Sequence, residues 1–318
     1  MKVIFIKNIL HSIFLFAFLF AGNSGLFSQR IVDITYRQDA RGAYVFSGIN
    51  HGFCNYILEI HFTVFDNLKA DREMPYRAEI KPGTNKLFSL LAVKPDVPVK
   101  FNYSSTYHKG CIHPAVDSDF TYLFPITPGK EAQVYEMSSP DKPAAEGISD
   151  NNWYVIRLKM KPGDTIYAAR KGVVTEVEDR DGSNDAGSGS PGKENYIELV
   201  HADCSFGRYG ILKKNGALVK PGQTVKAGQP IGLVGGDQYG RGSDIRFSVY
   251  YYQEEEVSRN GELLWKGFRN YIHLQCWTKN NGKGRLKHGA VYRSEFPLAV
   301  LNQESEKKSQ KPRMKAKK

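Results

Sequence analysis

The 318-residue sequence has few cysteines and only one long apolar run. Its four cysteines include no CxxC pair, so neither a zinc ribbon nor a thioredoxin-like redox motif is supported. It also lacks a GxxxxGKS/T segment and a strand-coupled GxGxxG segment, which argues against a phosphate-binding glycine loop. Because the long apolar run lies at the N-terminus, an integral protein with several membrane spans is excluded.

That apolar run indicates an export signal over residues 1–29. Lys2 and Lys7 precede an apolar stretch from Ile9 to Ala21, and small and polar residues follow it. This order is typical of a cleaved secretory signal, and the stretch is shorter than the roughly 20 residues of a membrane span. We therefore expect an exported protein, periplasmic or extracellular, that is not integral to the membrane after cleavage. An uncleaved membrane anchor is the alternative.

The formal net charge of +11 is concentrated at the two ends of the chain. The signal contributes two positive charges and residues 304–318 a net of five, which leaves +4 for the body. The tail has almost no apolar residues, so we expect it to be disordered. A nearly balanced, exported body argues against nucleic acid as a partner. The basic tail would meet anionic envelope polymers first, or would have no specific partner.

The four cysteines are interpreted in the light of export. An even number of cysteines in an oxidising compartment permits disulfides. Cys54 and Cys111 lie in the N-terminal half, and Cys204 and Cys276 lie in the C-terminal half. We expect pairing within each half, but spacing alone does not fix the connectivity.

Residues 30–137 contain short β-patterned runs separated by turn clusters. The runs at 56–65 and 86–93 are rich in β-branched and aromatic residues. Several such runs at short spacing predict a β-sandwich, of immunoglobulin-like type. Polar residues with proline over 138–150 then indicate a linker between two domains.

Residues 151–303 contain a weak internal repeat. KPGDTIYA at 161–168 matches KPGQTVKA at 220–227, and each is followed by glycine and a short β run. A turn and a strand used twice predict an antiparallel β domain with pseudo-symmetry. The whole chain is therefore expected to be all-β.

Within this second domain, the order and spacing of six segments resemble those of a known family. The segments are GDTIYAA at 163–169, GVV at 172–174, NYIELVH at 195–201, RYGIL at 208–212, VKPGQTVKAGQPIG at 219–232 and GSDIRF at 242–247. They resemble the lysostaphin-type (LytM-like) zinc endopeptidases, which cut peptidoglycan cross-bridges. The resemblance implies the fold of that family and a zinc site at defined positions.

The motif positions of that family hold different residues here. The resemblance implies an HxxxD pair, a histidine in a YxHL segment, and an HxH pair. The first pair falls on Trp153 and Arg157, the YxHL histidine on Ile211 after Tyr209, and the HxH pair on Asp244 and Arg246.

These replacements cannot hold a catalytic zinc. Such a zinc needs about three imidazole or carboxylate ligands and an open water site. Tryptophan and isoleucine offer no ligand atom, and arginine remains protonated. Asp244 could act as a ligand, but one carboxylate does not make a zinc site. The resemblance therefore implies a degenerate member without zinc or another cofactor, in which the six residues named above line a retained groove.

Strand alternation predicts what replaces the metal. Asp244, Arg246 and Ser248 would share the polar face of one strand, with their apolar neighbours facing the core. We expect Asp244 to form an ion pair with Arg157 or Arg246 that organises the groove in place of the metal. The alternative is that these are solvent-exposed replacements without a role.

Three functions are consistent with these residues. The resemblance favours an exported, catalytically inactive protein that binds peptidoglycan or another envelope protein, because inactive relatives regulate cell-wall hydrolases. The first alternative is an active zinc endopeptidase that uses other ligands, drawn from His201, Asp203, Asp244 and His273. The second alternative is a structural or adhesive envelope protein that acts through its sandwich and its basic tail.

Overall fold

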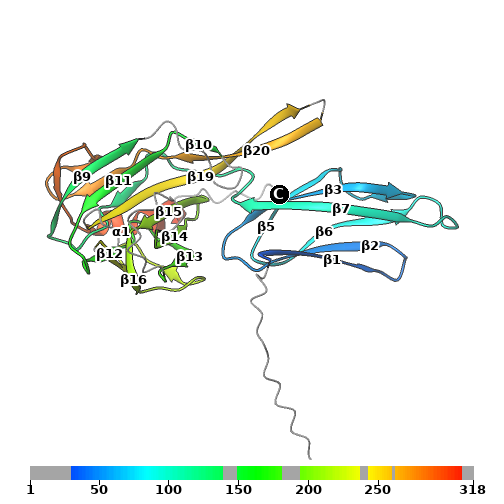
Figure 1. Cartoon of the computed structure of the whole chain (residues 1–318), viewed down its shortest axis with the longest axis horizontal. Coiled ribbons are helices and arrows are strands. Elements are labelled where there is room, and N and C mark those ends of the chain that lie inside the picture. The colour runs from blue at the N-terminus through cyan, green and yellow to red at the C-terminus, as the bar shows by residue number, and fades with distance from the viewer. Residues whose placement is uncertain (1–29, 139–148, 181–193, 237–242, 260–261, 310–318) are drawn as a thin grey trace, which may run out of the picture. The chain divides into compact units, whose positions relative to one another are not determined.

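The computed structural model describes residues 30–138, 149–180, 194–236, 243–259 and 262–309, and the residues from Ile31 onward form one compact unit. The expected signal, most of the expected linker and residues 310–318 lie outside the described residues. Figure 1 shows that the described chain is almost entirely β-structure, which confirms the expected all-β class. Among the described residues, no helix is both long and apolar enough to cross a bilayer.

The N-terminal part is a two-sheet sandwich. One sheet has the order β1-β2-β6-β4 and the other has the order β5-β3-β7. Lettered in chain order, these are A-B-F-D and E-C-G, which differs from the A-B-E-D and C-F-G sheets of an immunoglobulin constant domain. The strands are β1 (Val32–Gln38), β2 (Tyr44–Asn50), β3 (Tyr56–Asp66), β4 (Leu68–Ala70), β5 (Tyr76–Ile80), β6 (Gly83–Ala92) and β7 (Lys100–Lys109).

Aromatic rings fill the space between the two sheets of the sandwich. Phe46 of β2 stacks on Phe88 of β6, with 4.6 Å between their ring centroids, and both rings are fully buried. Leu58 and Ile60 of β3 enter the same core from the other sheet. Their alternate spacing along the strand places both side chains on one face, which explains why residues 56–65 could be identified as a strand.

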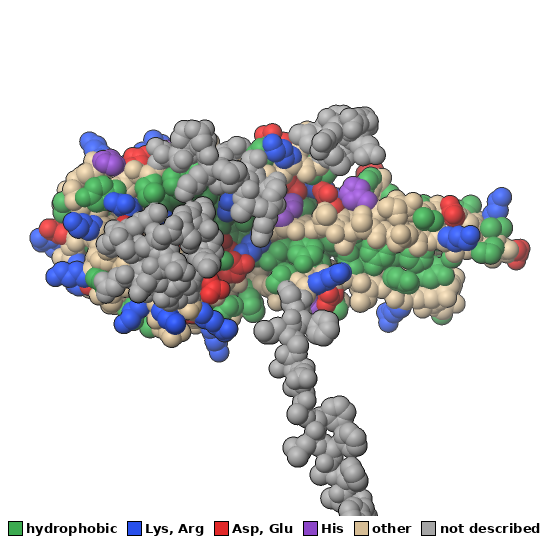
Figure 2. Space-filling view, viewed as in Figure 1, with side chains coloured by type: hydrophobic (Ala, Val, Ile, Leu, Met, Phe, Trp, Pro, Cys, Tyr) green, Lys and Arg blue, Asp and Glu red, His purple; other side chains and the backbone are tan. Residues whose placement is uncertain are grey.

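A larger sheet dominates the C-terminal part, which we call the C-terminal β domain. Its order is β17-β13-β14-β15-β19-β11-β9-β23, and β20 continues it beside β19. The strands are β9 (Glu131–Ser138), β11 (Tyr154–Lys159), β13 (Gly172–Glu178), β14 (Tyr196–Val200), β15 (Ser205–Gly210), β17 (Thr224–Val225), β19 (Asp244–Arg259), β20 (Glu262–Tyr271) and β23 (Val291–Arg293), with β10 (Ser149–Asn151) beside β20. In the face drawn in Figure 2, most visible Lys and Arg side chains lie over this domain.

The internal repeat forms two equivalent turns, as the sequence predicted. Gly163 and Gly222 have φ angles of 83° and 84°, and each turn is closed by a backbone hydrogen bond back to Lys161 or Lys220. Proline before a glycine with positive φ is the signature of a type II turn.

The strands that follow the turns exchange partners. β12 (Thr165–Tyr167) pairs with β18 (Pro230–Val234), and β17 pairs with β13. The first strand of each repeat therefore pairs with the second strand of the other, which confirms the predicted pseudo-symmetry. β16 (Leu212–Ala217) completes a small sheet beside β18.

Strand pairing crosses the expected boundary between the two domains. β9, from the segment assigned to the sandwich, pairs with β11 and β23. β8 (Thr121–Leu123) likewise pairs in parallel with β21 (Gln275–Thr278), which forms a hairpin with β22 (Gly282–Arg285). Residues from 120 onward thus contribute to the core of the C-terminal β domain. The division at 138–150 remains a prediction about independent folding.

The expectation of disorder from residue 304 is wrong for 304–309, because helix α1 covers Leu298–Ser309. Glu304, Glu306, Lys307 and Lys308 are strong helix formers, and they extend a helix that begins after Pro297. A high content of charged residues is compatible with disorder, but the same residues favour a helix once a first turn exists.

The cysteine pairing also differs from the expectation. A disulfide joins Cys111 to Cys204, with Cα atoms 6.1 Å apart, and Cys54 and Cys276 are free and buried. Pairing within each half is therefore wrong. The expectation failed because the positions of cysteines along the chain do not show which of them meet where two cores pack together. The disulfide ties the sandwich to the C-terminal β domain.

A buried ion pair reinforces this junction. Nζ of Lys109 in β7 lies 2.7 Å from Oε1 of Glu198 in β14 and 2.6 Å from Oε1 of Glu176 in β13. Burial by itself would raise the pKa of Glu198, but Lys109 and hydrogen bonds from Tyr250 and Thr175 outweigh burial and lower it. Glu198 is therefore ionised, and its charge is balanced across the junction.

Candidate functional site

Two ion pairs occupy the region where the zinc ligands were expected. Nε of Arg157 in β11 lies 2.9 Å from Oδ2 of Asp244, the first residue of β19. Nη1 of Arg246 lies 2.7 Å from Oε2 of Glu194, which precedes β14. We call Arg157, Asp244, Arg246 and Glu194 the charged quartet. The sequence predicted an ion pair of Asp244 with Arg157 or Arg246, and the structure has the pair with Arg157.

Strand register explains why the quartet needs both carboxylates. Arg157 and Arg246 lie directly opposite each other on the antiparallel strands β11 and β19. Like charges in such a pair repel each other. Asp244 and Glu194 each neutralise one guanidinium, and the ring of Tyr135 lies 4.9 Å from the guanidinium carbon of Arg157. The quartet is charge-balanced and cross-links β11, β19 and the start of β14.

The expected alternation along β19 is also present. Ile245, Phe247 and Val249 lie in the core of the C-terminal β domain. Asp244 and Arg246 therefore point to the opposite face of the strand, where the quartet lies. Only 8% of the surface of Asp244 is exposed, so this residue is not a solvent-exposed replacement.

Two other predicted site residues, Tyr209 and Ile211, are buried. Tyr209 is fully buried, its hydroxyl accepts a hydrogen bond of 2.8 Å from the Ala169 backbone, and its ring stacks on Phe247. Ile211 is also buried, and its φ of 67° is unusual for a β-branched residue. Because Gly210 lies opposite Arg246, Ile211 lies one residue beyond the quartet along the chain.

Trp153 is separated from the quartet. Its ring centroid lies 6.3 Å from that of Tyr271 in β20. Trp153 precedes β11, so Arg157 lies four residues further along an extended chain, or about 13 Å away. The structure thus brings together three of the six predicted site residues and adds Glu194, which no spacing pattern in the sequence indicates.

The alternative zinc ligands are each engaged elsewhere. His201 is buried, and its Nδ1 lies 2.8 Å from the carbonyl oxygen of Lys171. Asp203 forms an ion pair of 2.8 Å with Arg170, and the ring of His273 packs 4.3 Å from the ring of Tyr154. Over the described part of the chain, no three His, Cys, Asp or Glu side chains form a group that could hold a metal ion.

Burial controls the charge of His201. Burial, followed by the nearby Arg170 guanidinium, lowers the pKa of His201 to about 4. The imidazole is therefore neutral at pH 7. With Nδ1 against a backbone carbonyl, His201 acts as a structural residue between β14 and β15.

The residues at the family's ligand positions do not fit a catalytic zinc. The two carboxylates of the quartet are each bound to an arginine, and a guanidinium cannot act as a ligand. Because the arginines already neutralise both carboxylates, the quartet offers no net negative charge to attract a divalent cation.

Comparison with known proteins gives the class of this domain. Residues 151–259 match Peptidase family M23, and we call this part of the chain the M23 domain. The family's motif positions hold Trp153, Arg157, Ile211, Asp244 and Arg246, as in a degenerate member of that family.

Several solved structures match the chain. The catalytic domain of the antimicrobial peptidase lysostaphin from Staphylococcus simulans is 27% identical and covers 38% of this chain and 78% of that chain, with a TM-score of 0.25. The SpoIIQ–SpoIIIAH pore-forming complex matches at 21% identity over 46% and 89%, with a TM-score of 0.30. Csd3 from Helicobacter pylori matches at 13% identity over 69% and 70%, with a TM-score of 0.27. No curated protein matches.

Proposed function

We propose that this chain is an exported envelope protein whose M23 domain binds peptidoglycan, or regulates a partner hydrolase, without cleaving its ligand. The charged quartet carries this proposal, because Arg157 and Arg246 stand at expected ligand positions and each forms an ion pair with a carboxylate. Such pairs present fixed, directional hydrogen-bonding groups and can recognise polar or charged ligands. They offer no activated water for hydrolysis.

The position of the sandwich is compatible with a binding role. Tyr250 and Tyr252 of β19 belong to the core of the sandwich, whereas Asp244 begins the same strand. Six residues of strand separate Asp244 from Tyr250, a distance of about 20 Å. The sandwich thus packs against the M23 domain away from the quartet.

Binding and cleavage can be tested in one experiment on the exported chain. The protein is incubated with purified peptidoglycan sacculi, with and without added zinc, and both the pellet and the soluble fragments are analysed. We expect co-sedimentation, no release of soluble peptides, and less than about a tenth of an equivalent of bound zinc after dialysis. Peptide release that a chelator abolishes, with nearly one equivalent of zinc, would contradict the proposal and favour an active endopeptidase.

Matched arginine variants test the role of the quartet. Arg246→Ala should weaken binding to sacculi or to a captured hydrolase by about tenfold, because it removes a guanidinium and leaves Glu194 unpaired. Arg293→Ala is the control, because Arg293 forms an exposed pair with Glu131 on β9. Equal affinities for both variants would show that binding does not involve the quartet. Loss of binding in high salt and on deletion of 310–318 would instead favour an adhesive protein that acts through its basic tail.

A further inference from the structure

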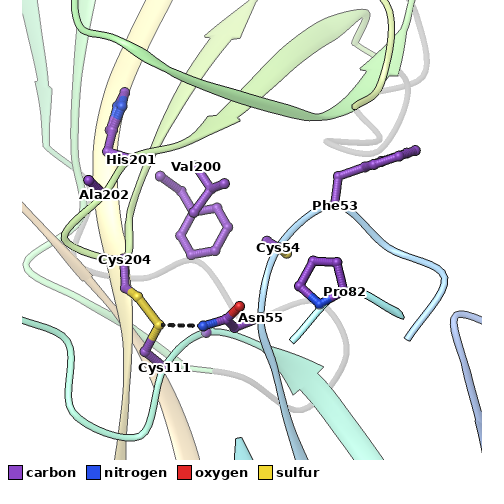
Figure 3. Close-up of a pocket in the computed structure, with 11 residues that line it drawn as sticks. Phe53, Cys54, Asn55, Pro82, Cys111, Val200, His201, Ala202 and Cys204 are labelled. Atoms are coloured by element: carbon purple, nitrogen blue, oxygen red, sulfur yellow. Dashed lines mark hydrogen bonds between the residues drawn. A yellow bond between two sulfur atoms is a disulfide. The ribbon is translucent and has the colours of Figure 1, made fainter. Parts of the chain in front are cut away.

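Three of the four cysteines line one pocket where the sandwich meets the M23 domain. The pocket has a volume of about 170 Å³, and both the Cys111–Cys204 disulfide and the free Cys54 line it (Figure 3). Cys54 and Cys111 come from the sandwich, and Cys204 comes from the turn between β14 and β15. Nδ2 of Asn55 donates a hydrogen bond of 3.5 Å to Sγ of Cys111, between the thiol and the disulfide.

The β3–β7 ladder ends close to Cys54 and Cys111. Tyr56 pairs with Lys109 at the end of the β3–β7 ladder, and the amide of Gly110 donates a hydrogen bond of 3.0 Å to the carbonyl of Asn55. Cys54 and Cys111 lie just beyond this end of the ladder, where neither belongs to a strand. Both residues line the same pocket, so Cys111 has Cys54 as a pocket neighbour as well as its disulfide partner Cys204.

We propose that Cys54, Cys111 and Cys204 form a thiol–disulfide exchange site that moves the disulfide from Cys111–Cys204 to Cys54–Cys111. This proposal is independent of the function proposed for the quartet. In the first state, the disulfide ties the sandwich to the M23 domain. In the second state, the disulfide lies within the sandwich, and the covalent tie between the two parts is gone.

The exchange needs no external oxidant or reductant. The Cys54 thiol loses its proton to solvent, and its thiolate attacks Sγ of Cys111. The Cys54–Cys111 bond forms as the Cys111–Cys204 bond breaks. Cys204 leaves as a thiolate and takes up a proton, so one thiol and one disulfide are present before and after the step.

Burial holds the site in its first state. Only 4% of the surface of Cys54 is exposed, and burial raises the pKa of its thiol to about 12. The Lys109 ammonium and a hydrogen bond with Tyr56 lower the pKa of this thiol, whereas the carboxylates of Glu198 and Glu176 raise it, and burial outweighs them all. Exchange therefore requires a local opening of the junction, and a partner that separates the sandwich from the M23 domain would trigger it.

Disulfide mapping tests the exchange directly. The four cysteines fall on four separate tryptic peptides, which end at Lys69, Lys130, Arg208 and Lys279. The full chain is held at mildly alkaline pH in a denaturant concentration below its unfolding transition, trapped with N-ethylmaleimide, digested and analysed by mass spectrometry. We expect the Cys111–Cys204 peptide pair to decline while the Cys54–Cys111 pair and labelled Cys204 increase together.

Two variants serve as controls. Cys276→Ser should exchange like the parent chain, because Cys276 lies in another core. Cys54→Ser should keep the Cys111–Cys204 pair under the same conditions. The proposal is overturned if Cys54 becomes labelled while the original pair persists, or if Cys54 instead pairs with Cys204. Both results are read in the parent chain, so they do not depend on whether a variant folds.

Discussion

At the scale of single residues, the main feature is that two arginine–carboxylate pairs occupy the region where metal ligands were expected. Arg157 and Arg246 face each other across two strands, and each is neutralised by one carboxylate. Removing one charge of a pair leaves the other charge partly buried and without its counter-charge, which lowers the stability of the folded chain. The quartet should therefore contribute to stability as well as to binding.

The variant Asp244→Asn tests that contribution. It removes the charge that balances Arg157, so we expect the free energy of unfolding to fall by about 2 kcal/mol. Urea unfolding followed by tryptophan fluorescence measures the change. Glu131→Gln is the matched control, because the exposed Glu131–Arg293 pair should contribute less than about 0.5 kcal/mol. Equal losses in the two variants would rule out a special role for the quartet.

His201 should make stability depend on pH. Its pKa is about 4 in the folded chain, against about 6.5 when unfolded, so the unfolded state binds more protons between these values. The stabilisation is present above pH 6.5 and is lost as the pH falls towards 4. We expect a loss of about 2 kcal/mol between pH 7 and pH 5 from this residue alone.

The measurement compares unfolding curves of the parent chain and His201→Asn at several pH values. The quantity compared is how steeply the unfolding free energy changes with pH in each protein, since the substitution will also change stability at neutral pH. Parallel pH profiles for the two proteins would show that the buried imidazole does not contribute to the pH dependence.

At the scale of elements, the two KPG turns have the same backbone but different neighbours. A Cβ atom at Gly222 would lie 2.7 Å from the ring of Phe53 in the sandwich, whereas nothing lies within 4 Å at Gly163. Both glycines have a positive φ, so substitution carries the same conformational cost at both. The two sites therefore form an internal comparison.

Gly222→Ala should destabilise the chain more than Gly163→Ala. We expect about 1 kcal/mol for Gly163→Ala from the positive φ, and about 1–2 kcal/mol more for Gly222→Ala from the clash with Phe53. Thermal unfolding of both variants measures the difference. Adding Phe53→Ala to each variant should remove most of the stability difference between them. A difference that survives this substitution would contradict the proposed contact.

Elements with a local signature were predictable from the sequence. Proline and glycine define the two turns, and alternation defines β3 and β19. The pairing of β8 with β21 and of β9 with β23 was not predictable, because the partner strands lie far apart in sequence. Helix α1 was not predicted because its charged residues suit both a helix and a disordered tail.

The candidate site, too, could be predicted from the sequence only in part. An ion pair of Asp244 with either Arg157 or Arg246 could be predicted, since the family resemblance placed all three at motif positions and the charges are opposite. The structure shows that the partner is Arg157. Glu194 was not predicted because it lies next to a long polar segment with no pattern. Trp153 was placed by spacing alone, and it lies before the start of β11, with its ring beside Tyr271.

At the scale of the whole molecule, the junction between the sandwich and the M23 domain depends on Lys109. Lys109→Met would leave Glu198 buried without its counter-charge, and we expect a loss of about 3 kcal/mol in unfolding free energy. Adding Glu198→Gln should restore part of this loss. Chemical denaturation measures both variants.

Lys130→Met is the control for Lys109, because the Lys130 side chain is 54% exposed in its pair with Asp164. Its effect should stay below about 0.5 kcal/mol. If Lys109→Met were equally mild, the buried pair would contribute no net stability and the disulfide would be the main tie at the junction.

The pairing of β9 with β23 bears on the order in which this chain can fold during synthesis. Glu131 lies opposite Arg293, so this edge of the sheet cannot close until the last part of the chain has been made. A ribosomal product that stops before residue 290 would keep a long strand with unsatisfied backbone groups. Such open edges promote aggregation, so premature stop codons late in the gene should give insoluble protein rather than a shortened, working one.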